Sequence, residues 1–158
     1  MKLKNKLIAV VLIFSAITVS AQDDLFSKFS NNENVTHVLV TKSLLSMIPD
    51  ISTGGMNIKS LADKLDRLEI YTCNNPEIAK QMIAEVEPIK NDKSYETLMS
   101  IKDKDEKLNF YMQKDSDDKF KELIMIVEAP NESTIIRIIG SFTMQDIQNV
   151  TGVIANSL

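Results

Sequence analysis

The chain has 158 residues, and its formal net charge at pH 7 is −4. A chain of this length can bury the core of a single domain without disulfides or metals to hold it together. The acidic balance argues against a nucleic-acid partner and against electrostatic docking on anionic lipid, because both attract basic surfaces. Cys73 is the only cysteine, so an internal disulfide is excluded.

The first 21 residues have the pattern of a cleaved export signal. Three lysines lie within the first six residues, and an apolar stretch follows from Leu7 to Ile17. That stretch is shorter than the roughly 20 residues needed to span a bilayer, and the small residues Val19-Ser20-Ala21 match a signal-peptidase site. We therefore expect residues 1–21 to be removed before Gln22 and residues 22–158 to form one domain.

These features predict that the mature protein is periplasmic or secreted. The formal charge falls from −4 to −7 because the leader carries three lysines and no acid. An exported chain without disulfides fits a bacterial envelope better than a eukaryotic secretory route. A lipid-anchored lipoprotein would have a cysteine where this chain has Gln22, which argues against a lipid anchor. After the leader, we expect no integral membrane segment.

Hydrophobic periodicity predicts alternating helices and strands in the first half of the chain. Thr41 is expected to cap a short helix that Pro49 ends, and Asn75 with Pro76 is a strong start for a longer one, which Pro88 should disturb near its end. The expected elements are helix 23–31, strand 35–40, helix 42–48, a loop over 50–56, helix 57–64, strand 67–73 and helix 76–89.

The second half predicts four strands and a final helix. The strands are 95–101, 107–113, 120–128 and 134–141, joined by short polar turns that favour antiparallel hairpins. Strand 120–128 is apolar on both faces and should be central, whereas Arg137 suggests that one face of strand 134–141 reaches solvent. Thr143 should cap the last helix, with an apolar stripe at Met144, Ile147, Val150, Thr151, Ile154 and Leu158.

This order of elements predicts an α+β fold with two layers. We expect one mixed, mostly antiparallel sheet of about six strands, with helices mainly on one face. The early strand–helix–strand units favour parallel neighbours with right-handed crossovers. Tyr95, Thr97, Met99 and Ile101 should share one face of their strand, and Met82, Met99 and Met144 fall on stripes expected in the core.

The sequence lacks the residue patterns that most catalytic and metal-binding sites require. Gly54-Gly55 is the only glycine pair, and the chain has no phosphate-binding glycine motif. His37 is the only histidine and lies within a strand, with no nucleophile-elbow pattern beside it. One histidine and one cysteine give poor support for zinc, so Cys73 is interpreted as a reduced thiol, with an intermolecular disulfide as the alternative. We assign no catalytic, cofactor-binding or metal residue.

Two acidic turns are candidates for calcium binding or for hydrolysis. Asp115, Asp117 and Asp118 lie in one turn, and Asp103, Asp105 and Glu106 lie in another. The first turn lacks the glycine of an EF-hand loop and has a lysine at a ligand position, so solvated hairpin turns are the better interpretation. Paired carboxylates could also serve glycoside hydrolysis, but their separation in space is not visible in the sequence.

Several stretches resemble one known family. They are the leader ending VSAQ, the segment LFSKFSNNENVTHVLVTKSLLSMI, and the segment YETLMSIKDKDEKLNFYMQKDSDDKFKELIMIVEAPNESTIIRIIGSF, which closes on Gly140. The chain resembles the exported family described as domain of unknown function 4252, found mainly in Bacteroidetes. The resemblance implies a small envelope protein that is exported or lipid-anchored, without an activity that can be carried to any residue, and fold alone would not supply one.

Three hypotheses for the function follow. The leading one is an exported, non-enzymatic envelope protein: a binding, scaffold or stress-response module that acts through its sheet face or through the loop at residues 52–57. The partner would be an envelope protein or a small ligand. The alternative is a carrier of a small ligand or lipid, with a cavity between sheet and helices. The third is a hydrolase using carboxylates drawn from Asp103, Asp105, Asp115 and Asp117.

Overall fold

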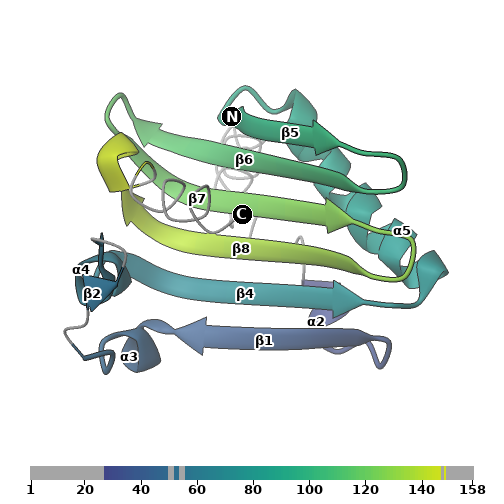
Figure 1. Cartoon of the computed structure of the whole chain (residues 1–158), viewed down its shortest axis with the longest axis horizontal. Helices are drawn as coiled ribbons and strands as arrows, with labels where there is room; N and C mark the ends of the chain where they lie inside the picture. Colours follow the sequence, from purple (N-terminus) through teal and green to yellow (C-terminus); the bar gives the residue numbers. More distant parts are fainter. Residues whose placement is uncertain (1–26, 50–51, 54–55, 147, 149–158) are drawn as a thin grey trace, which may run out of the picture.

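Six strands form one sheet in which every pairing is antiparallel (Figure 1). The computed structural model describes residues 27–49, 52–53, 56–146 and 148. The strand order across the sheet is β1-β4-β8-β7-β6-β5. The strands are β1 (Val35–Thr41), β4 (Leu65–Cys73), β5 (Tyr95–Lys102), β6 (Lys107–Ser116), β7 (Lys119–Glu128) and β8 (Ser133–Phe142).

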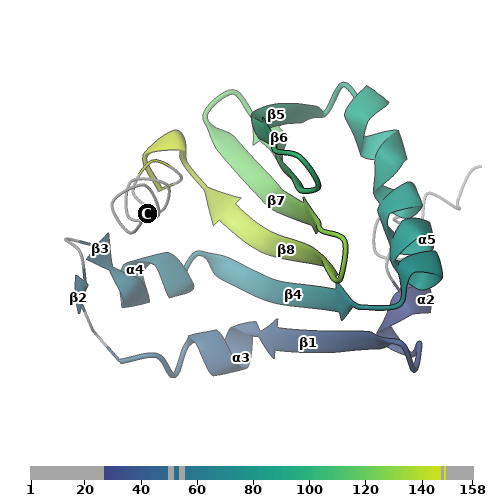
Figure 2. The same ribbon diagram turned by 45° about the vertical axis from the view of Figure 1, so that its right-hand side comes forward.

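The helices that contribute to the main core lie on one face of this sheet (Figure 2). They are α2 (Ser27–Ser30), α5 (Pro76–Val86) and the 3-10 helix η1 (Glu87–Asn91). At one end of the sheet, β1 is linked to β4 through α3 (Lys42–Leu45), a small ladder of β2 (Ser52–Thr53) with β3 (Met56–Asn57), and α4 (Ile58–Ala62). The structure therefore confirms the expected α+β class with six strands and helices mainly on one face.

Helix α5 begins where the sequence predicts, and its α-helical part ends at Val86, before Pro88. The Asn75 side chain accepts hydrogen bonds from the backbone N–H groups of Glu77 and Ile78, at 3.1 and 3.2 Å, and Pro76 occupies the first helical position. At the other end, the α-helix changes to the 3-10 helix η1, which contains Pro88. A proline has no backbone N–H to continue the α-helical pattern, so this change is the expected disturbance.

The parallel neighbours expected early in the sheet are not present among the described strands. β4 and β5 do run in the same direction, as a strand–helix–strand crossover through α5 requires, but β8, β7 and β6 lie between them. Strands β6, β7 and β8 form consecutive hairpins, and together they occupy the positions between β4 and β5 in the sheet. The segment between β1 and β4 stays at one end of the sheet, so β4 returns antiparallel to β1.

A β-bulge in β5 overturns the expected face of that strand. The register with β6 shifts between Thr97 and Met99, so Tyr95 and Thr97 face the helices while Met99 and Ile101 face the other side. Met99 is therefore 42% exposed rather than in the core. Met144 is also exposed, whereas Met82 is fully buried as expected.

Other local expectations have mixed outcomes. Thr41 precedes α3, but its side chain makes no capping hydrogen bond. Thr143 does cap: its hydroxyl accepts from Asp146 N at 3.3 Å, and the Asp146 carboxylate accepts from Thr143 N at 2.8 Å. The loop expected over 50–56 contains the β2–β3 ladder. Its glycine pair lies outside the described residues, as do the leader and most of the predicted last helix, including Ile147.

Buried side chains form two clusters on opposite faces of the sheet. The larger one lies between the sheet and the helices, and it includes Phe29 of α2 and Met82 of α5. The smaller one lies on the other face, near the end of β8. Its buried members are Met112, Phe120, Leu123 and Phe142.

Candidate functional site

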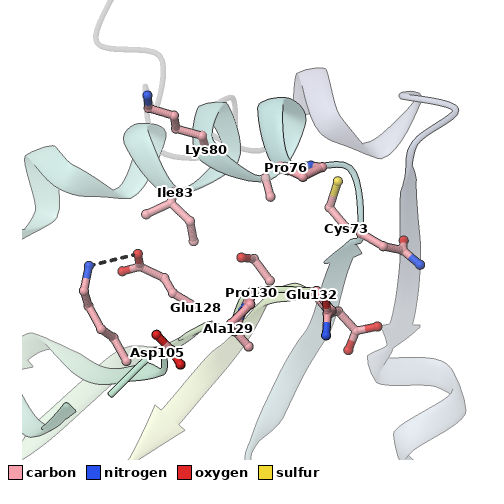
Figure 3. Close-up of a pocket in the computed structure, with 14 residues that line it drawn as sticks. Cys73, Pro76, Lys80, Ile83, Asp105, Glu128, Ala129, Pro130 and Glu132 are labelled. Atoms are coloured by element: carbon pink, nitrogen blue, oxygen red, sulfur yellow. Dashed lines mark hydrogen bonds and ion pairs between the residues drawn. The ribbon is translucent and has the colours of Figure 1, made fainter. Parts of the chain in front are cut away.

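A pocket of about 300 Å³ lies at the end of the sheet where β7 turns into β8 (Figure 3). The first turns of α5 form one wall and the turn at residues 129–132 forms another. Asp105, from the turn between β5 and β6, lies at its border. Pockets for small molecules begin at about this volume, so this one suits a small ligand.

The pocket is mixed in polarity. In Figure 3, the Ile83 side chain extends from α5 toward the pocket, whereas Lys80 points away from it. Lys107 forms an ion pair with Glu128, with Nζ and Oε2 3.4 Å apart. The N-terminus of α5 borders the pocket, but the Asn75 side chain already accepts from two of its free N–H groups. That cap weakens any attraction for an anion there.

Cys73 lies at the inner border of the pocket and is a free thiol, as predicted. Its side chain is fully buried, and its sulfur lies 3.5 Å from the carbonyl oxygen of Asn75. A thiol buried in this way is a poor partner for a cysteine of another chain, because disulfide formation requires close approach of both Cβ atoms. The geometry therefore argues against the intermolecular disulfide.

The helix-side face also carries a buried ion cluster, which we define as Arg137, Glu69, Glu122, Tyr71 and Tyr95. Arg137 Nε donates to Glu122, and its Nη1 lies 3.4 Å from Glu69 Oε2. The Tyr95 hydroxyl donates to Glu122 at 2.5 Å, and the Tyr71 hydroxyl donates to Glu69 at 3.3 Å. Arg137 is only 4% exposed, so the expectation that it marks a solvent-facing strand face is wrong.

The cluster compensates for the lost hydration of the buried Arg137 guanidinium. A buried charge is tolerated when an opposite charge and hydrogen bonds compensate for its lost hydration. β4 and β7 lie on either side of β8, so each contributes a carboxylate beside the guanidinium. Burial, followed by the neighbouring Glu69, raises the pKa of Tyr71 to about 12. Burial and the hydrogen bond to Glu122 also raise the pKa of Tyr95, which keeps both phenols neutral.

The four carboxylates considered for hydrolysis do not come together. Asp103 and Asp105 lie before β6, and Asp117 follows it, while Asp115 lies near its end. A strand of ten residues spans about 33 Å, and all four side chains are exposed. Among the described residues, no group of three or more histidine, cysteine or acidic side chains could hold a metal ion.

His37 lies on the helix-side face, beside β4. Its ring stacks on Tyr71 with centroids 4.4 Å apart and planes inclined by 10°. Tyr71 is its register partner, which places Cys73 diagonally across from it on the same face. The fold therefore brings the single histidine and single cysteine near each other, but two such residues are too few for a zinc site.

The other face of the sheet carries an uncharged band, apolar except for three threonines, which we call the apolar band and define by two rows of register partners across all six strands. The first row is Val38, Ile70, Ile136, Met125, Phe110 and Met99. The second row is Thr36, Thr72, Thr134, Val127, Leu108 and Ile101. Neither row contains a charged side chain. At its ends the band reaches solvent, since Val38 is 44% and Ile101 is 52% exposed.

Sequence reasoning missed both the ion cluster and the band. Glu69, Glu122 and Arg137 are separated by many residues, and only the strand order brings them together. One signal was available: Arg137 is the single charged residue of β8, and an isolated charge in an apolar strand needs a partner. The band required the register, because a strand alone does not show which of its faces the helices will cover.

The fold and these surfaces define a small α+β protein with helices on one side of an antiparallel sheet, an apolar band on the other side and a small pocket at one end. Within the part of the chain that the structure describes, no helix is long and apolar enough to cross a membrane.

A family model described as Domain of unknown function (DUF4252) matches residues 29–150, so the chain belongs to this family. This match confirms the resemblance seen in the sequence. A search of the curated proteins and a search of the solved structures each found no match.

Proposed function

We propose that this chain is an exported, non-enzymatic binding module of a bacterial envelope, which holds a partner protein against the apolar band. One observation carries the proposal: the band crosses all six strands without a charged side chain. Its ends are well exposed, with Val38, Met99 and Ile101 between 42% and 52% accessible. Apolar surfaces of this kind on soluble proteins often mark sites of protein interaction.

The chemistry of the band favours a protein over other partners. An apolar sheet face can pack against a helix or a second sheet, whose apolar side chains interdigitate with its own. The pocket, where a small molecule would bind, opens at the end of the sheet beside α5 and not on the band. The net charge of −7 expected for the mature chain disfavours anionic membrane surfaces.

Export rests on the leader pattern in residues 1–21. This pattern predicts that the protein lies in the periplasm or outside the cell, and its partner would lie in the same compartment. Sequencing the N-terminus of protein recovered from the periplasm of its own host tests this step. A mature chain that begins at Gln22 supports export through the leader, and an intact leader on protein that stays in the cytoplasm contradicts it.

Binding at the band is tested by one charged substitution and a matched control on the same strand. Ile101→Lys adds a charge to the band, whereas Thr97→Lys adds it to an exposed position of β5 on the helix-side face. Wild type and both variants are purified from the periplasm under identical conditions, and the amount of each co-purifying protein is compared. Thermal unfolding confirms that both variants fold.

We expect one co-purifying protein to remain with wild type and T97K and to fall at least tenfold with I101K, a change of about 1.4 kcal/mol in binding. Equal recovery with all three proteins would show that the band is not the binding site. Loss with both variants would point to a general effect of charge on β5. Turnover of a substrate by the purified protein, abolished by one point mutation, would refute the non-enzymatic function.

A second candidate is a carrier of a small ligand, which the pocket between α5 and the β7–β8 turn favours. Native mass spectrometry of the periplasmic protein would show a bound mass that is lost on denaturation. Ile83→Trp should fill the pocket and abolish the bound mass, whereas Gln81→Trp, at an exposed position of α5 that does not line the pocket, should not. A bare protein, or a bound mass unaffected by I83W, would contradict this function.

A further inference from the structure

The two edges of the sheet are built differently. Edge strand β5 has a bulge between Thr97 and Met99, and its charged residues Glu96 and Lys102 lie toward its two ends. Edge strand β1 pairs with β4 in seven consecutive positions without a shift. Its sequence, VTHVLVT, contains no acidic residue, lysine, arginine or proline. In Figure 1, no described element lies beyond β1.

An edge like β1 is a template for another strand. The outer side of an edge strand presents backbone N–H and C=O groups without a ladder partner, and natural proteins usually block such edges with bulges, charges or proline. β5 is blocked in this way and β1 is not. Seven residues of β1 give an edge of about 23 Å, long enough for an antiparallel ladder, and the N–H of Val35 at its start already donates to the carbonyl oxygen of Asn32.

Backbone geometry limits how β1 can pair with a second β1. In an antiparallel ladder, the outward N–H and C=O groups belong to every second residue. Two copies of one strand must therefore match residues of the same parity, so that paired residue numbers sum to an even value. The register that overlaps all seven residues is centred on Val38, which then lies opposite Val38 of the second copy.

The side chains agree with this register. Thr36 comes opposite Val40, and Val35 opposite Thr41, so β-branched residues meet across the strands, which is a favourable pairing in sheets. His37 comes opposite Leu39, whose 49% exposed side chain would gain a neighbour. Glu33 precedes β1 and Lys42 follows it, so opposite charges come near each other at both ends, where Lys42 also pairs with Asp66 of its own chain.

We propose that β1 pairs antiparallel with β1 of a second copy of this chain, in the register centred on Val38. The two six-stranded sheets then form one continuous sheet, with both sets of helices on the same side. The apolar bands of the two copies join at Val38 and present one surface of double length. The pairing uses the edge of the sheet, so it goes beyond partner binding at the face and does not depend on it.

Introducing a charge at Val38, where the two copies of the strand meet symmetrically, tests the pairing. Val38 is 44% exposed, so Val38→Lys and Val38→Asp should fold as monomers but place like charges face to face in the dimer. Sedimentation velocity of residues 22–158 should show a concentration-dependent dimer for wild type and a dissociation constant at least tenfold higher for each variant. Mixing V38K with V38D should restore the dimer, which variants that merely misfold cannot do. Met99→Lys, at the other end of the same row, should leave it unchanged.

Engineered cysteines test the register, because Cys73 is buried and free. Residues directly opposite have Cα atoms about 4.5–5.5 Å apart, within disulfide range. V38C alone should therefore cross-link two copies under mild oxidation, as should a mixture of T36C with V40C. T36C alone should not, because four residues of strand separate its two copies by about 13 Å.

Three results would overturn the proposal: a wild-type monomer at about 1 mM, a dimer that V38K does not weaken, or equal cross-linking by V38C and T36C. These outcomes are separate from those of the binding module. Loss of the co-purifying protein with I101K tests binding at the apolar band on the sheet face. A monomeric chain could still lose its partner in this way. A dimer that retains no partner would support the edge pairing and contradict the binding function.

Discussion

Arg137→Met tests whether the ion cluster holds the sheet together. Methionine keeps an unbranched stem in the same space but removes the guanidinium from between Glu69 and Glu122, whose side chains are 9% and 5% exposed. Removing one partner of a buried ionic group leaves uncompensated charge and costs about 3–5 kcal/mol. For a domain of this size, each kcal/mol corresponds to about 4 °C, so we expect the melting temperature to fall by about 12–20 °C.

Differential scanning calorimetry at pH 7 measures this loss, with Lys107→Met as the control. Lys107 pairs with Glu128 at 3.4 Å, and its side chain is 51% exposed, so its loss should cost about 1 kcal/mol or less. Replacing both glutamates by glutamine in the R137M background should recover much of the stability, because no charge then stays buried alone.

A stability loss of R137M no larger than that of K107M would refute the reasoning. So would a loss that persists after Glu69 and Glu122 are both replaced by glutamine.

Two further predictions concern the backbone and the tyrosines. Gly140→Ala would place a Cβ against the carbonyl oxygen of Lys64, and we expect it to lower the free energy of unfolding by about 1–3 kcal/mol in urea titrations; an unchanged midpoint would contradict the close approach of β8 to β4. Burial raises the pKa of Tyr71 to about 12 and raises those of Tyr95 and Tyr111 above the ordinary value of 10, so the rise in absorbance at 295 nm should be centred above pH 10. The stability that the neutral phenols provide is complete below pH 10 and falls as the pH approaches 12; a phenol titrating near pH 10 in the folded protein would show that one of them is not buried.

Much of the local structure could be predicted because short-range chemistry determines it. The strands from Tyr95 to Phe142 follow alternation and turn residues, and the caps at Asn75 and Thr143 use side chains within three residues of the groups they bind. The errors arose where a single residue changes the geometry. The bulge beyond Thr97 moved Met99 and Ile101 to the other face, and alternation cannot reveal an extra residue in a strand.

The candidate sites were less accessible to sequence reasoning. The sequence around Arg137 predicts a solvent-facing side chain, because its two acidic partners come from other strands and are not visible beside it. The pocket draws on α5 and three separate segments of strand or turn, none of which carries a motif. The carboxylates at Asp103 and Asp117 could be compared only once β6 was known to separate them.

By itself, the sequence determined the α+β class, the positions of the strands and the family of this protein, because periodicity, caps and turn residues act over short distances. The tertiary structure alone decided the strand order, the partners of Arg137 and the two different edges of the sheet. These depend on which strands lie side by side, and β-pairing joins residues that are far apart in the chain. The unblocked edge at β1 and the apolar band that meets it exist only when the sheet is complete.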